Sequence, residues 1–96
     1  MTNSLISKIQ LSIQRALLGE ITDKVRGVTF KLENNKIEIL TYYDGEITED
    51  NQESVDCALT EIYADFENIE ISWDIKRIDY PHKIICLDHW VYLRKE

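Results

Sequence analysis

Two alternating segments joined by Asn34-Asn35 constrain the fold of this chain most strongly. Residues 25–33 and 36–43 are predicted to be strands. In the first of them, apolar side chains at positions 28, 30 and 32 alternate with polar ones at 29, 31 and 33, and a period of two is that of a β-strand. Adjacent asparagines readily adopt the positive φ angles that a two-residue hairpin turn needs. The sequence therefore predicts an antiparallel hairpin. Its expected facing pairs are Leu32 with Ile37, Phe30 with Ile39, Val28 with Thr41, Arg26 with Tyr43, and Lys31 with Glu38.

A helix over residues 4–18 is predicted ahead of the hairpin. Its large apolar side chains recur every three or four residues, which places them on one side of a helix with 3.6 residues per turn. They are Ile6, Ile9, Ile13 and Leu17. Gly19 is well placed to end this helix. Since an apolar stripe has to be buried, we expect the helix to pack on a sheet.

A second helix is predicted over residues 50–66. The same spacing recurs here at Val55, Leu59, Ile62 and Phe66. Asp50 is followed three residues later by Glu53, which resembles a capping box, so we expect the helix to start at Asp50.

Two further strands are predicted after the second helix, over residues 69–80 and 84–93. Pro81 has no N–H to donate to a sheet, so it indicates a turn over residues 79–83. Both faces of the last strand are rather apolar, which favours a central or doubly covered position.

The order of these elements is helix, hairpin, helix, hairpin. It predicts a single α+β domain covering residues 1–96, with a four-stranded antiparallel sheet and both helices on one face. A chain of 96 residues can build one hydrophobic core without help from a cofactor or a metal ion.

Composition points to a cytoplasmic protein. The sequence holds no run of the roughly 20 apolar residues that would span a bilayer, and its N-terminus does not resemble a signal peptide. Cys57 and Cys86 are 29 positions apart in such a chain, so we expect free thiols rather than a disulfide.

Catalytic chemistry is poorly represented. Asp88 and His89 are adjacent on a predicted strand, so their side chains point to opposite faces. The two cysteines lie far in sequence from both histidines, and the isolated glycines form neither a phosphate loop nor a dinucleotide-binding motif. The sequence therefore predicts a protein that is not an enzyme, with no catalytic, cofactor-binding or metal-binding residues.

Charge is distributed very unevenly along the chain. Residues 37–75 carry 12 of the 18 acidic residues and no lysine or arginine. A net charge of −7 disfavours nucleic acid and anionic membranes as partners, because phosphate groups need clustered bases. The acidic stretch therefore predicts a protein-binding surface, although a merely solvated helix face is the competing interpretation. The expected partner-binding residues are Tyr42, as an aromatic anchor, and Asp44, Glu46, Glu49, Glu53, Asp56, Glu61 and Glu67.

Four short segments resemble small bacterial immunity proteins, which are encoded beside polymorphic or contact-dependent growth inhibition toxins. These segments are residues 16–21 (ALLGEI), 42–46 (YYDGE), 60–62 (TEI) and 90–96 (WVYLRKE). The resemblance implies a non-enzymatic inhibitor that binds the C-terminal domain of a cognate toxin, often a basic nuclease, inside the producing cell. Two alternatives remain: an acidic interaction subunit or homo-oligomer without a toxin-neutralising role, and a small enzyme with an unrecognised site.

Overall fold

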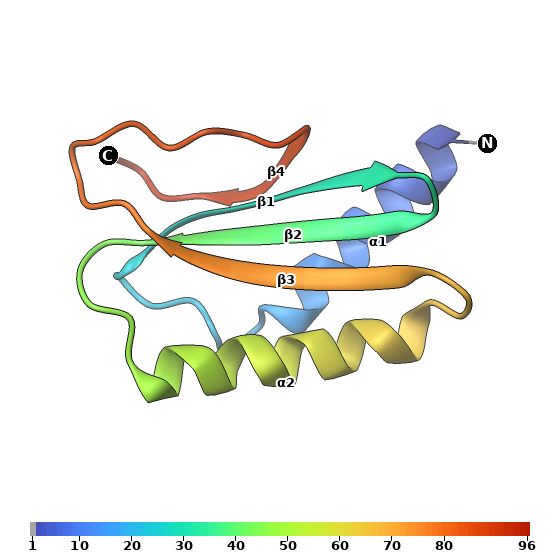
Figure 1. Ribbon diagram of the computed structural model, residues 1–96, viewed down its shortest axis with the longest axis horizontal. Coiled ribbons are helices and arrows are strands. Elements are labelled where there is room, and N and C mark those ends of the chain that lie inside the picture. The colour runs from blue at the N-terminus through green and yellow to red at the C-terminus, as the bar shows by residue number, and fades with distance from the viewer. Residues whose placement is uncertain (1) are drawn as a thin grey trace.

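The computed structural model describes residues 2–96 as one four-stranded sheet with two helices packed against it (Figure 1). The helices are α1 (Thr2–Ala16) and α2 (Glu49–Asp65). The strands are β1 (Val25–Glu33), β2 (Lys36–Tyr43), β3 (Glu70–Arg77) and β4 (His89–Leu93). The predicted α+β class is confirmed.

The β1–β2 hairpin has the predicted turn and almost the whole predicted register. Asn34 and Asn35 have φ angles of 50° and 62°, and the Lys31 Nζ atom lies 3.1 Å from the Glu38 carboxylate across the strands. The predicted pairing of Arg26 with Tyr43 is wrong, because Val25 faces Tyr43 and Arg26 is the extra residue of a β-bulge. A bulge re-aims the side chain it carries, and the Arg26 side chain reaches Glu96 and the Ile78 carbonyl oxygen.

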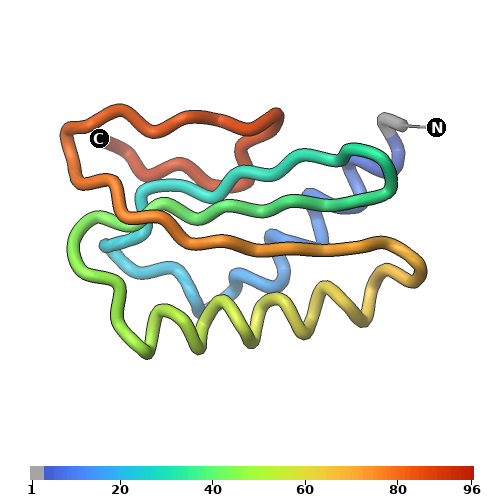
Figure 2. The backbone as a smooth tube through the Cα atoms, viewed as in Figure 1, coloured from blue at the N-terminus to red at the C-terminus, as the bar shows by residue number. Residues whose placement is uncertain are grey.

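The sheet is mixed, so the prediction of a purely antiparallel sheet is wrong. The strand order is β3-β2-β1-β4, with β3 parallel to β2 and β4 antiparallel to β1. Parallel neighbours need a crossover of a dozen or more residues, and α2 supplies it between β2 and β3. The backbone trace in Figure 2 shows the consequence, since the last two strands lie at opposite edges of the sheet instead of forming a second hairpin.

The chain between β3 and β4 forms a loop over the sheet face that carries no helix. Residues 84–88, predicted to be strand, are irregular. The Tyr42 hydroxyl donates to the Ile85 carbonyl oxygen at 2.6 Å, and the Leu87 N–H donates to the Thr29 hydroxyl at 2.9 Å. The expected turn around Pro81 is present, with the His82 N–H donating to the Asp79 carbonyl oxygen at 2.8 Å.

The residues that end α1 and begin α2 can be identified. Gly19 lies just beyond α1 with a φ of +81°, in the left-handed conformation that commonly follows a helix. The start of α2 differs from the prediction, because Thr48 rather than Asp50 caps it. The Asn51 N–H donates to the Thr48 hydroxyl at 3.2 Å, and the Thr48 N–H donates to the Asn51 side chain at 2.9 Å. Asparagine here replaces the usual Glu or Gln of a capping box.

The core lies between the helices and one face of the sheet. Phe30, Ile39, Ile62 and Phe66 are buried there in one cluster, and Leu59 is partly buried against it. Trp73 is also part of this core, where its indole N–H donates to the Thr41 hydroxyl at 2.8 Å.

Candidate functional site

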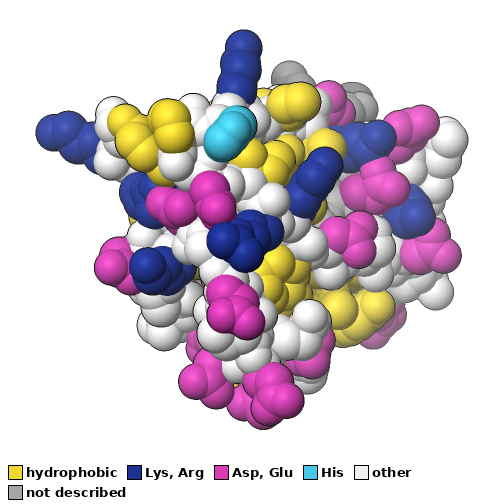
Figure 3. All heavy atoms as spheres, turned by 60° about the vertical axis from the view of Figure 1, so that its left-hand side comes forward, with side chains coloured by type: hydrophobic (Ala, Val, Ile, Leu, Met, Phe, Trp, Pro, Cys, Tyr) yellow, Lys and Arg dark blue, Asp and Glu magenta, His cyan; other side chains and the backbone are white. Residues whose placement is uncertain are grey.

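The outward side of α2 is an acidic surface. We call the carboxylates of Glu46, Glu49, Glu53, Asp56, Glu61 and Glu67 the acidic face; all six residues are exposed. Glu49, Glu53 and Asp56 are spaced by four and three residues, which places them on one side of the helix. The opposite side is buried through Val55, Ala58 and Ile62. In Figure 3 acidic side chains gather at the lower end of the molecule, where α2 begins.

No carboxylate of the acidic face forms an ion pair within the described chain. Within residues 4–96, whose side chains are described, all ion pairs with N···O distances up to 4.0 Å involve other acids. Asp65, near the end of α2, shows the contrast: it accepts from the Ser12 hydroxyl at 2.6 Å and from Arg15 at 3.2 Å, so it fastens α2 to α1. The acidic face is therefore free for an outside partner.

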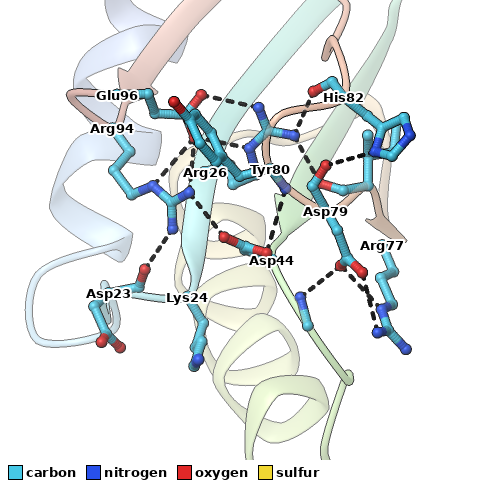
Figure 4. A network of polar contacts seen from close by, with 12 residues as sticks. Asp23, Lys24, Arg26, Asp44, Arg77, Asp79, Tyr80, His82, Arg94 and Glu96 are labelled. Atoms are coloured by element: carbon cyan, nitrogen blue, oxygen red, sulfur yellow. Dashed lines mark hydrogen bonds and ion pairs between the residues drawn. The ribbon is translucent and has the colours of Figure 1, made fainter.

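A second group of charges lies where the 44–48 loop, the 78–83 loop and the C-terminal residues meet (Figure 4). Arg26, only 2% exposed, is its centre. Its guanidinium donates to both oxygens of the Glu96 carboxylate at 2.7 and 2.9 Å, and to the carbonyl oxygens of Ile78 and His82, each at 2.7 Å. The bulge in β1 aims the side chain into this position. Four of the five N–H groups of the buried cation thus donate to segments distant in sequence.

Arg94 and Asp79 extend this group, which we call the Arg26 network. Arg94 donates to the Asp44 carboxylate at 3.0 Å and to Glu96 at 2.8 Å. Asp79 accepts from Arg77 at 3.0 Å and from the Gly45 N–H at 2.7 Å. The network ties the start of β1, the end of β3 and the C-terminal residues to the loop that leads into α2.

The network lowers the pKa of its acids. Hydrogen bonds from Arg26 are the main cause that lowers the pKa of Glu96 to about 2, although partial desolvation opposes them. The hydrogen bond from Arg94 lowers the pKa of Asp44, and that from Arg77 lowers the pKa of Asp79. The charges of these acids are paired with arginines inside the protein, whereas those of the acidic face are not.

Two of the predicted partner-binding residues have internal roles. Tyr42 is 3% exposed, with its hydroxyl bound to the loop of residues 78–88 and its ring 6.4 Å from that of Trp90. The structure therefore does not support its expected role as an exposed aromatic anchor. Asp44 is held by Arg94 and by the Tyr80 N–H at 3.3 Å. The register had placed Tyr42 on the face away from the helices, but nothing in the sequence indicated that a later loop covers it.

The cysteines and histidines do not assemble into a recognisable reactive group. Cys57 is exposed, whereas the Cys86 sulfur lies 3.5 Å from the Thr29 hydroxyl. The His89 ring packs at 5.1 Å from that of Phe30, and a His82 ring nitrogen lies 3.1 Å from the Asp79 carbonyl oxygen. In the region that the structure describes, no group of three His, Cys, Asp or Glu residues could hold a metal ion.

Sequence reasoning missed Arg26, Arg94 and Glu96. One signal for Arg26 was present, because it precedes Gly27 inside a strand that is otherwise apolar or β-branched at its start. A Cβ atom on Gly27 would lie 2.7 Å from the Trp90 ring, so this ring packs directly against the Gly27 backbone. Arg26 is buried beside it and a buried charge needs an acid nearby, but the sequence did not identify which one.

No helix within residues 2–96 combines the length and apolar character of a membrane span.

Comparison with curated proteins gives no match. The family model described as MafI2 immunity protein matches residues 6–96, which includes every strand, both faces of the sheet and the acidic face of α2. Because this match covers nearly the whole sequence and agrees with the resemblance to small immunity proteins of bacterial polymorphic toxin systems, the chain belongs to the MafI2 immunity protein family.

Proposed function

We propose that this protein neutralises a cognate bacterial toxin by binding it through the acidic face of α2. Membership of an immunity protein family supports a toxin as the partner. The observation that carries the choice of surface is that the acidic face is exposed and has no basic partner within the described chain.

Beyond the first turn, where Glu49 and Asp50 suit the positive end of the helix dipole, the charges on α2 do not serve the stability of the helix. Glu49 and Glu53 are four residues apart, and such like-charge pairs destabilise a helix by about 0.2–0.5 kcal/mol each. Glu61 lies toward the negative end of the helix dipole, where acids are unfavourable. A surface that costs stability and makes no internal contacts is readily explained by binding.

The partner that fits this surface is a basic protein domain, and a nuclease is the class we propose. A nuclease presents lysine and arginine side chains arranged for phosphate groups, and exposed carboxylates can occupy the same positions. Complementary charge speeds association and sets specificity more than it adds affinity. Binding there would block access of nucleic acid to the toxin, so the inhibitor itself needs no catalytic step. We place this event in the cytoplasm of the producing cell.

Charge reversal on α2 tests the proposal. The double variant Glu53→Lys, Asp56→Lys changes two exposed residues that make no ion pair within the described chain, so the fold should be retained. The matched control is Asp23→Lys, Asp88→Lys, which makes the same change in net charge. Both control residues are exposed, lie outside α2 and β3, and form no ion pair within residues 4–96.

Binding of each variant to the toxin domain encoded beside this protein should be measured by surface plasmon resonance, together with protection of cells expressing that toxin. We expect the α2 variant to associate about tenfold or more slowly and to protect poorly, while the control behaves like the parent. Equal losses in both variants would mean that net charge, and not this surface, governs binding. A parent protein that neither binds the toxin nor protects against it would contradict the proposed function.

A further inference from the structure

The outer edge of β3 is a free strand edge. Within residues 2–96, β2 is its sole neighbour in the sheet, and the pairing shows no register shift over its eight residues. The Glu70 N–H donates to the Asn35 carbonyl oxygen at 3.2 Å, and the Ile78 N–H donates to that of Tyr43 at 3.0 Å. Even-numbered residues therefore direct their backbone groups at β2. The residues that direct theirs outward are Ile71, Trp73, Ile75 and Arg77.

This edge lacks most of the features that usually prevent strand pairing. Proteins protect edges with proline, bulges, charged side chains or covering segments. β3 has no proline, glycine or bulge, and its basic residues, Lys76 and Arg77, are confined to its last two positions. Within residues 4–96, one side chain reaches the edge: the Tyr63 hydroxyl donates to the Ile71 carbonyl oxygen at 3.1 Å. The other outward backbone groups remain available to an added strand.

Tyr63 connects the edge to the acidic face. It follows Asp56 by seven residues, or two turns, so it lies on the same side of α2. Its side chain is 51% exposed although it is large and aromatic, and exposed tyrosines of this kind are common anchors of interfaces. The edge of β3, Tyr63 and the acidic face therefore form one continuous surface.

We propose that an extended, basic strand of the toxin pairs with the outer edge of β3. The inference rests on the proposed function and assigns the way in which the partner docks. Main-chain hydrogen bonds from alternate residues hold an added strand at a sheet edge, and Tyr63 packs against it. The acidic face beside the edge then meets the basic side chains that flank the strand.

Charge favours a toxin strand over a second copy of this chain. Pairing two β3 edges would bring two α2 helices toward each other, and residues 37–75 contain no lysine or arginine. Like-charge juxtaposition at an interface is strongly unfavourable. A basic strand meets the same surface with opposite charge.

Amide hydrogen exchange, followed by NMR, tests the pairing in the free protein and in its complex with the neighbouring toxin domain carrying an inactivating substitution. In the free protein, the amides of Trp73 and Ile75 should exchange fast, and those of Ser72 and Asp74, bonded to β2, should exchange slowly. On binding, the outward amides should slow by about tenfold or more, because they acquire acceptors.

The outcomes separate the two proposals. A toxin that binds without slowing the outward amides overturns strand pairing and leaves the proposed function intact. A toxin that does not bind overturns both. A third outcome is that the outward amides already exchange slowly in the free protein, and that their protection increases with protein concentration. This result would show that a second copy occupies the edge and would also overturn the inference.

A pair of substitutions provides an independent readout. Tyr63→Ala should raise the Kd for the toxin by about 30-fold, as loss of an interface anchor does, and mainly by faster dissociation. Leu11→Ala on α1 is the matched control, since Leu11 is also a large exposed side chain, at 59%, and should leave the Kd unchanged. A Kd for Tyr63→Ala within about twofold of the parent would remove Tyr63 from the interface.

Discussion

Arg26 shows how one residue can hold distant parts of this chain together. It is a buried cation with a bidentate carboxylate partner and two carbonyl acceptors. A buried ion pair contributes little net stability by itself, because desolvation offsets the attraction. Removing one partner is costly, since the groups left behind remain desolvated and unpaired.

Arg26→Ala should therefore destabilise the protein by about 3 kcal/mol, a large part of the total stability of a small domain. Urea denaturation followed by tryptophan fluorescence measures the change. Lys24→Ala, two residues away and exposed, is the control and should stay within about 0.5 kcal/mol of the parent. Equal stability of the two variants would show that the Arg26 network does not hold the loops.

Acid should weaken the fold through Glu96. Its pKa is about 2 in the folded protein against an ordinary value of 4.5, so the folded state binds fewer protons than the unfolded chain between these values. The stabilising contribution of Glu96 is complete above about pH 4.5 and is lost as the pH falls toward 2. Asp44 and Asp79 act in the same direction, because their pKa values are also lowered.

The free energy of unfolding, measured in urea at several pH values, should fall steadily below about pH 4.5. Glu96→Gln should flatten this dependence and lower the stability at pH 7. If the variant and the parent show the same slope in acid, the coupling between Arg26 and Glu96 is not what the structure indicates.

At the scale of elements, the spacing of apolar residues predicted those features that depend on residues close together in sequence. The hairpin turn, its register beyond the bulge and the stripe on α2 all followed from residues close together in sequence. The boundaries of β4 did not, since residues 84–87 form an apolar run typical of a strand but are held by side chains such as Tyr42 and Thr29 instead of a neighbouring strand. An apolar run can therefore lie in a loop over the sheet, where it is only partly buried and Ile85 is 66% exposed.

The stripe on α2 gives a graded prediction. Ile62 is fully buried, so Ile62→Ala should cost about 2–5 kcal/mol. Leu59 is only partly buried, and Leu59→Ala should cost clearly less. Urea denaturation of the two variants measures the loss in the free energy of unfolding. A larger loss for Leu59 would mean that α2 is rotated about its axis from the orientation described.

At the scale of the whole molecule, topology was the part least accessible from sequence. The strand-helix-strand order of β2, α2 and β3 is compatible with a parallel pair, and the assumption that neighbouring strands form hairpins concealed it. The acidic face was more accessible, because the absence of lysine and arginine from residues 37–75 is visible in the sequence alone. Which acids are engaged internally depended in part on long-range pairs, such as Arg26 with Glu96 and Arg94 with Asp44, which are 70 and 50 positions apart.

Association with the toxin should depend on salt. Exposed charges are screened beyond about 8 Å at 0.15 M ionic strength, and the acidic face lies at the surface. Raising NaCl from about 0.05 M to about 0.5 M should therefore slow association by about tenfold or more, with a smaller effect on dissociation. Stopped-flow mixing measures both rates, and an association rate independent of salt would argue against steering by this surface.

The division of the acids into two groups has a consequence for diversification. Asp44, Asp79 and Glu96 are committed to the Arg26 network, whereas the acidic face makes no ion pairs within the described chain. Exposed positions of that kind tolerate replacement within about 0.5 kcal/mol. With the toxin bound at this surface as proposed, changes along the outer side of α2 would alter the choice of toxin while the scaffold beneath stays intact, so that new specificities would arise without loss of the fold.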